Sequence, residues 1–145
     1  DQTGIVPIME FWAHSKSAHT LGEAACIAVE AHHPKSCILG DVFHLYKGGS
    51  DWPGLAMLRG ARLGIFHMTD SPAQPPRQTI TDADRVMPGD GIAPLGEILR
   101  TLRDIGYRGH LSLELFSKTY WAQDPLSVAR LGLEKMKAAV AAALG

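Results

Sequence analysis

Short apolar runs alternate along the chain with longer stretches in which apolar residues recur at helical spacing. Four of the apolar runs have the length and composition of buried β-strands: residues 4–11, 36–41, 63–67 and 110–116. A strand followed by a helical stretch, repeated along a chain, is typical of βα units that share a parallel sheet. The pattern therefore predicts an α/β fold of four such units, and no break in composition divides residues 1–145 into separate domains.

Capping and proline signals set the expected helix boundaries. Thr20 and Glu23 have the spacing of a capping box, and Pro53 and Pro125 stand where a first helical turn accepts proline. The expected helices cover residues 20–32, 52–62, 94–105 and the stretch from 124 onward.

The longest irregular segment, residues 69–93, is rich in proline, aspartate and glycine. Loops of this length inside a compact domain are usually functional or disordered. We favour a functional loop.

Composition narrows the class of ligand. The 145 residues are 46% hydrophobic and carry 14 Lys and Arg against 15 Asp and Glu, for a formal net charge of -1. A protein with so small a net charge is not expected to bind nucleic acid or an anionic membrane surface, whereas binding of small neutral or mildly anionic ligands is compatible with it. Because no apolar run approaches the roughly 18 residues of a spanning helix and the first residues do not resemble a signal peptide, we expect a cytoplasmic protein.

An ionisable residue stands near the carboxyl end of each predicted strand: Glu10, Asp41, His67 and Glu114. The carboxyl ends of parallel strands lie at one edge of a sheet, and ligands bind there. In the fourth run Glu114 alternates with Leu113 and Leu115, so it is expected to point away from the covering helices and toward the site.

Three carboxylates and an imidazole at one edge would repel one another and lose hydration unless a cation held them. Taken singly, an acid at a strand end is more often a helix cap or a surface charge. Together the four favour a divalent metal ion, and oxygen-rich ligation with one nitrogen suits Mn²⁺, Mg²⁺ or Co²⁺ and is compatible with Zn²⁺.

Longer motifs surround these residues: Glu10-Phe11, Asp41-Val42-Phe43-His44, His67-Met68-Thr69-Asp70, Thr81-Asp82-Ala83-Asp84-Arg85-Val86-Met87-Pro88-Gly89-Asp90-Gly91, Gly106-Tyr107 and Ser112-Leu113-Glu114-Leu115-Phe116. With them the sequence resembles the C-terminal half of the sugar phosphate isomerase/epimerase family of xylose isomerase-like TIM barrels, and within that family the inosose isomerases. The resemblance covers nearly the whole chain.

The resemblance implies half of a (β/α)8 TIM barrel with a divalent metal ion (Mn, Mg, Co or Zn) on four ligands: Glu10, Asp41, His67 and Glu114. Glu10 and Glu114 would also be the catalytic acid and base. His44 and Arg85 would bind the substrate, a small-molecule ketose or cyclitol.

Three functions are compatible with this set. The first is an isomerase or epimerase that moves a proton next to a carbonyl through an ene-diolate. The second is a dehydratase of the inosose or dehydroshikimate type, which would use the same metal and carboxylates to expel a hydroxyl group. The third is a non-catalytic half-barrel partner. We favour the first.

Length sets the main constraint on this interpretation. A (β/α)8 barrel takes about 250 residues and eight strands, whereas this chain supplies four units. A half barrel standing alone would expose two sheet edges and an apolar inner face, which proteins normally cover. We expect an N-terminal half-barrel to complete it, with self-association of the half as the weaker alternative.

Other residues carry weaker signals. Five histidines match no motif and are interpreted as surface or packing residues: His14, His19, His32, His33 and His110. Four aromatic residues are candidates for the wall of a sugar site: Trp12, Trp52, Tyr120 and Trp121. For Trp52 packing is at least as good an explanation.

Overall fold

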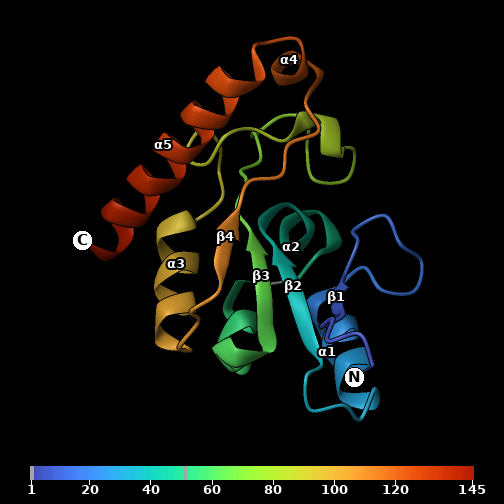
Figure 1. Ribbon diagram of the computed structural model, residues 1–145. Helices are drawn as coiled ribbons and strands as arrows, with labels where there is room; N and C mark the ends of the chain where they lie inside the picture. Colours follow the sequence, from blue (N-terminus) through green and yellow to red (C-terminus); the bar gives the residue numbers. More distant parts are fainter. Residues whose placement is uncertain (1, 51) are drawn as a thin grey trace.

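The computed structural model describes residues 2–50 and 52–145, and its centre is a four-stranded parallel sheet (Figure 1). The strands lie in chain order: β1 (Ile8–Glu10), β2 (Cys37–Asp41), β3 (Leu63–His67) and β4 (His110–Ser112). Each strand therefore pairs with the strand that follows it in sequence. The predicted α/β class, with four βα units on a parallel sheet, is confirmed.

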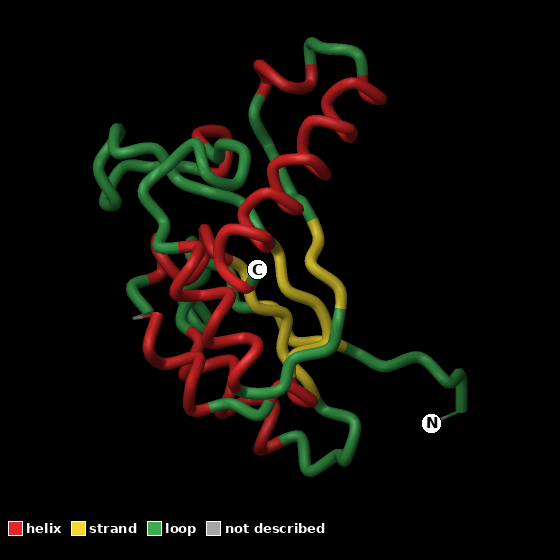
Figure 2. Tube along the Cα trace, turned by 90° about the vertical axis from the view of Figure 1, so that its left-hand side faces the viewer, coloured by secondary structure: helices red, strands yellow, loops and turns green. Residues whose placement is uncertain are grey.

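The helices are α1 (Leu21–Glu30), α2 (Val42–Gly48), α3 (Leu95–Asp104), α4 (Lys118–Trp121) and α5 (Pro125–Leu144). Three 3-10 segments join them: η1 (Trp52–Met57), η2 (Gly60–Arg62) and η3 (Asp82–Asp84). Helices α1, α2 and α3 lie on one side of the sheet, and α4 and the start of α5 lie beyond the carboxyl ends of the strands (Figure 2). Among these helices, none in the described part of the chain has the length and apolar character required to cross a bilayer.

The capping signals act as the sequence predicts. Thr20 accepts a hydrogen bond from the Glu23 backbone N–H, and the Glu23 side chain accepts from the Thr20 backbone N–H, which completes the capping box of α1. Asp124 accepts from the N–H of Ser127 at 2.8 Å and begins α5. Both caps satisfy N–H groups that the first helical turn leaves without a partner.

The hydrophobic core lies between the sheet and the helices. Ile38 and Phe66 project from β2 and β3 into it, and Ile98 and Leu102 project from α3; all are buried. Burying apolar side chains of this size stabilises the fold by about 1.5–3 kcal/mol each.

The opposite face of the sheet carries side chains of the other strand parity. Ile8, Leu39 and Ile65 lie on this face and are only partly buried. At its carboxyl edge the same face carries Asp41 and His67, which are partners in the β2–β3 register. The site therefore lies on the face away from the helices.

Two strands are shorter than the apolar pattern suggests. The first run was expected over 4–11, but only Ile8–Glu10 pairs with β2. The fourth was expected over 110–116, but β4 ends at Ser112, opposite His67, which is the last residue of β3. Hydrophobicity marks burial, whereas a strand also needs a neighbour with which to pair, so the expected boundaries were too wide.

The expected helix over residues 52–62 is wrong. The chain forms α2 immediately after β2, and residues 52–62 form only η1 and η2. Gly49 is the C-cap of α2 and has the left-handed conformation, with φ 89°. With only seven residues, α2 is too short for a helical period of apolar positions to be recognised in the sequence.

Candidate metal and active site

Four side chains from the four strand ends converge at one point. One ligand atom from each of them lies within 4.8 Å of all the others: Glu10, Asp41, His67 and Glu114. His67 Nδ1 lies 3.8 Å from Glu10 Oε1, 3.3 Å from Asp41 Oδ2 and 3.4 Å from Glu114 Oε2. The imidazole nitrogen thus faces three carboxylates.

The ends of the parallel strands explain this convergence. Glu10, Asp41 and His67 are the last residues of β1, β2 and β3, and Glu114 follows β4 by two residues on the inward parity. Asp41 is fixed further because its Oδ1 accepts the N–H of His44 at 2.8 Å and caps α2. This bond leaves Asp41 Oδ2 for the cluster.

The environment shifts the ionisation of the cluster. Burial by itself would lower the pKa of His67, but the contacts with Asp41 and Glu114 outweigh it and raise the pKa to about 9. Contact with His67 lowers the pKa of Glu114. Burial and the neighbouring Glu114 raise the pKa of Glu10. For Asp41, burial opposes ionisation, yet His67 and Arg85 hold its pKa below the ordinary value.

Arg85 lies beside the cluster and is almost completely buried. Its Nη1 donates to Asp41 Oδ2 at 2.9 Å and to Glu114 Oε2 at 3.2 Å. Its guanidinium also lies over the rings of Phe43 and Phe116, at 4.6 and 5.3 Å from their centroids. A buried charge is tolerable only when it is paired, and here two carboxylates of the cluster supply the pairing.

His44 is buried behind the cluster. Its Nε2 lies 3.1 Å from Arg85 Nη2, and its Nδ1 lies 3.4 Å from the backbone nitrogen of Ala13. Burial and the positive charge of Arg85 lower the pKa of His44 although Asp41 opposes the shift, so the imidazole is neutral at pH 7.

A cavity of about 310 Å³ opens beside these groups. Its lining includes Glu10, Glu114 and His44, and two aromatic side chains, Trp12 and Phe116, which are 52% and 40% exposed. Of the four aromatic candidates from the sequence, only Trp12 lines this cavity.

The long loop between β3 and α3 is held by a buried carboxylate. Asp70 Oδ1 accepts the N–H groups of Ser71 and Ala93, each at 2.8 Å, and Oδ2 accepts that of Gly89 at 3.0 Å. A Cβ on Gly91 would lie 2.3 Å from Ser71 O and 2.4 Å from Asp70 Oδ1. Asp70 and Gly91 therefore fix the conformation of this loop, and the loop places Arg85 beside the cluster.

The donor set fits a divalent cation. His67 Nδ1 is buried and makes no hydrogen bond, although three carboxylate oxygens face it. The carboxylates of Glu10, Asp41 and Glu114 outnumber the single guanidinium beside them, so the cluster has an excess of negative charge when His67 is deprotonated. One nitrogen and several oxygens match the preferences of Zn²⁺, Mn²⁺ and Co²⁺.

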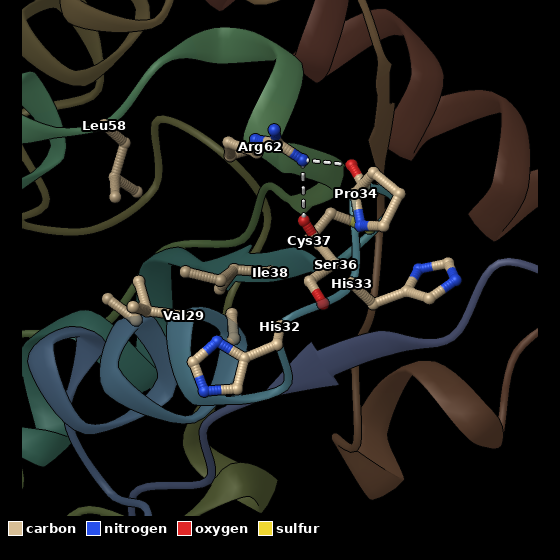
Figure 3. A pocket seen from close by; sticks show the side chains of 11 residues that line it. Val29, His32, His33, Pro34, Ser36, Cys37, Ile38, Leu58 and Arg62 are labelled. Atoms are coloured by element: carbon tan, nitrogen blue, oxygen red, sulfur yellow. Dashed lines mark hydrogen bonds between the residues drawn. The ribbon is translucent and has the colours of Figure 1, made fainter.

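A larger hollow of about 510 Å³ lies elsewhere (Figure 3). Val29, His32 and Ile38 line it, and Arg62 in its wall donates to the carbonyl oxygens of Pro34 and Ser36. It lies at the amino ends of β2 and β3, whereas the ligand atoms gather at the carboxyl ends. We therefore place the candidate site at the smaller cavity.

Two residues near the site were not singled out from the sequence. Asp82 contacts Arg85 at 2.7 Å, and His14, interpreted as a surface or packing residue, lies 3.1 Å from the same aspartate. Asp82 belongs to the Thr81–Gly91 motif and so carried a signal. His14 had no signal, because its partner lies 68 residues along the chain.

Comparisons with known proteins agree with the fold. The family model for the xylose isomerase-like TIM barrel matches residues 1–139. Inosose isomerases from Bacillus licheniformis and Halalkalibacterium halodurans are 31% and 32% identical over 119 residues. Each match covers 81% of this chain and 42% of the relative, so the chain spans less than half the length of these curated relatives.

Solved structures give the same picture. The crystal structure of the IolI protein with a bound zinc atom superposes with a TM-score of 0.92 at 25% identity, over 100% of this chain and 52% of that one. An L-ribulose 3-epimerase shares the fold at 18% identity, with a TM-score of 0.76 over 98% of this chain and 49% of that one.

Proposed function

Since the chain belongs to the family of xylose isomerase-like TIM barrels, we propose that it is the catalytic half of a metal-dependent isomerase or epimerase. The proposed substrate is a small ketose or cyclitol. The observation that carries the proposal is the convergence of Glu10, Asp41, His67 and Glu114 within 4.8 Å beside a cavity of about 310 Å³.

In this proposal the four converging residues hold the ion. A bound divalent cation would supply Lewis-acid polarisation of a substrate carbonyl, which is worth several kcal/mol of charge stabilisation. Two inosose isomerases about 30% identical to this chain, and a structural relative with a bound zinc atom, support the choice of reaction class and cofactor. Which ion is native is left to experiment.

Glu10 and Glu114 are the proposed acid and base. Both line the cavity, so a substrate in it would lie between two carboxylates. One carboxylate removes the proton from the carbon next to the carbonyl, and the other returns a proton at the same or the neighbouring carbon. A well-placed base of this kind contributes about 10²- to 10⁴-fold to the rate.

The remaining groups bind and orient the substrate. His44 is neutral and lines the cavity, so it suits a contact with a substrate hydroxyl or carbonyl oxygen. Trp12 offers an exposed aromatic face to the apolar side of a ring. Arg85 also borders the cavity.

The proposal includes a second half-barrel. The curated relatives and the zinc-bound neighbour are about twice as long as this chain, and Ile8, Leu39 and Ile65 are only partly buried on the inner face. An N-terminal half in the same protein is the partner we favour, and a second copy of this chain is the alternative. Either would supply further strands next to β1 and β4.

The test is solvent hydrogen exchange by the complete, metal-loaded protein. A panel of ketoses and inososes is incubated in D₂O, and products are identified by mass and chromatography. We expect deuterium on carbon in at least one substrate without loss of water. Loss of one water would identify the dehydratase instead, and no turnover of any compound together with no tight binding of Zn²⁺, Mn²⁺ or Co²⁺ would support the non-catalytic half-barrel.

A further inference from the structure

Asp82 lies outside the converging four residues, yet it joins two loops to them. We propose that Asp82 is a positioning residue: it holds the guanidinium of Arg85 so that Arg85 fixes Asp41 and Glu114 in the orientation that metal binding and proton transfer require. This inference rests on the proposed function, because it assigns the control of that same site.

Arg85 donates to three carboxylates of the protein. A guanidinium has five N–H donors and no acceptor. Nε and Nη2 donate to Asp82 Oδ1 at 3.1 and 2.7 Å, and Nη2 also faces His44 Nε2 at 3.1 Å. Nη1 donates to Asp41 Oδ2 at 2.9 Å and to Glu114 Oε2 at 3.2 Å. These contacts with three carboxylates hold Arg85 in place and orient Asp41 and Glu114.

Among the described residues, Asp82 is the carboxylate that accepts from two nitrogens of Arg85, both through Oδ1. It meets the edge of the guanidinium formed by Nε and Nη2, and this contact fixes the plane of the group. With that plane fixed, Nη1 points at the two cluster carboxylates. Because Arg85 is 1% exposed, its positive charge depends on carboxylate partners in the protein.

The position of Asp82 is itself fixed from both sides. It begins η3, whose capping box joins Thr81 to Asp84. Its second oxygen, Oδ2, lies 3.1 Å from His14 Nε2, in the loop after β1. Asp82 thus connects that loop with the long loop between β3 and α3, and both approach the same carboxylates.

The test compares Asp82→Asn, Arg85→Lys and the double variant in the complete protein. Asn keeps the size of Asp82 and an acceptor oxygen, but it removes the negative charge that balances the buried guanidinium and the oxygen that faces His14. Lys keeps the charge of Arg85 but loses the planar group. The matched controls are Asp104→Asn and Arg103→Lys, because Asp104 and Arg103 form an exposed pair at 2.8 Å on α3.

Two measurements are made on each variant. Co²⁺ alone is titrated and followed by its visible absorption, and the kcat and KM of solvent exchange are measured with the best substrate. Loss of groups that orient metal ligands typically costs about 10- to 100-fold in metal affinity or activity. We expect Asp82→Asn to lose that much in Co²⁺ affinity and in kcat, with KM within about twofold, and the double variant to be no worse than Arg85→Lys.

The outcomes separate the alternatives. Co²⁺ affinity and kcat of Asp82→Asn within twofold of wild type would overturn the inference, as would a change in KM alone, which would assign the pair to substrate binding. Additive losses in the double variant would also overturn it. If the wild type exchanges no substrate, the proposed function fails, and the Co²⁺ titration still tests the positioning role. Far-UV circular dichroism identifies any variant that does not fold; in that case Arg85→Lys alone is judged by the same two readouts.

Discussion

At the scale of single residues, the cluster is an arrangement in which a proton and a metal ion compete for one nitrogen. Three carboxylates surround His67 Nδ1 and raise the pKa of His67 to about 9. At pH 7 the imidazole therefore holds a proton that a metal ion must displace. The same carboxylates that attract the proton would attract the ion.

This competition predicts that metal affinity rises with pH. Below pH 9 each ion bound at His67 must release about one proton, so the apparent affinity should increase about tenfold per pH unit and level off near pH 9. Calorimetric titration of Mn²⁺ or Co²⁺ between pH 6 and 8.5, in buffers of different ionisation enthalpy, measures the protons released. The exposed His110 provides the control variant His110→Gln, which should behave as wild type. Binding without proton release would contradict this assignment.

A second prediction concerns the proposed acid and base, Glu10 and Glu114. Glu10→Gln and Glu114→Gln preserve shape but remove the carboxylate, so each should lower the rate of exchange between substrate carbon and solvent deuterium by at least about 10²-fold. Mass spectrometry of the recovered substrate measures the exchange. Glu134→Gln, at an exposed position on α5, should leave the rate unchanged. Near-wild-type exchange in either active-site variant would remove that residue from the acid/base pair.

The sequence could predict which residues meet but not everything that surrounds them. Glu10, Asp41 and His67 each end a strand, and parallel strands bring their ends together, so this convergence follows from order alone. The contact of His14 with Asp82 depends on how two loops fold over the sheet, which no local pattern encodes.

At the scale of elements, the loop between β3 and α3 is held in one conformation by its own hydrogen bonds. Its path is fixed by three backbone N–H groups that converge on Asp70 and by a close approach at Gly91. A fully buried carboxylate with three such bonds favours one loop conformation. Because Arg85 lies on this loop, the geometry of the cluster depends on it.

Two glycine substitutions test this point. Gly91→Ala would place a methyl group within 2.4 Å of Ser71 O and Asp70 Oδ1, and we expect it to lower the free energy of unfolding by about 1–3 kcal/mol. Gly22→Ala in α1 has no atom within 4 Å, and there alanine should raise the free energy of unfolding by up to about 1 kcal/mol. Urea denaturation of both variants provides the comparison, and equal effects would show that the loop yields to the extra atom.

Elements were predictable where the pattern and the pairing agree. The limits of β3 match the expected 63–67, and α3 and α5 begin next to Pro94 and Asp124 as expected. The helix α2 was missed, because its seven residues are too few for a helical period of apolar positions to be recognised. Its start depends on the Asp41 side chain bonding to the N–H of His44, and a residue pattern does not distinguish that cap from a metal ligand.

At the scale of the whole molecule, the sheet has a covered face and an open face. Helices α1, α2 and α3 lie on one side of the sheet (Figure 2). The partly buried Ile8, Leu39 and Ile65 share the strand parity of the other side. Strands β1 and β4 are the two edges of the sheet in the described part of the chain. Open parallel edges and apolar faces favour association with further strands.

We therefore predict that residues 1–145 expressed alone will associate with one another, and that an added N-terminal half-barrel of the same protein will replace this contact. Sedimentation velocity measures the assembly state, and thermal unfolding measures its cooperativity. A monomer that unfolds cooperatively at this mass would contradict the need for a second half.

The distribution of one ligand to each strand has a consequence for folding fidelity. A slip of one residue would turn a carboxylate to the helix side, and a slip of two would carry it about 6.6 Å along its strand, farther than the 4.8 Å that spans the cluster. A misaligned sheet thus loses a ligand, and only the correctly aligned one retains all four. A cation bound by all four ligands would therefore stabilise the correctly aligned sheet over misaligned ones, and its uptake would serve as an assay for correctly folded chains.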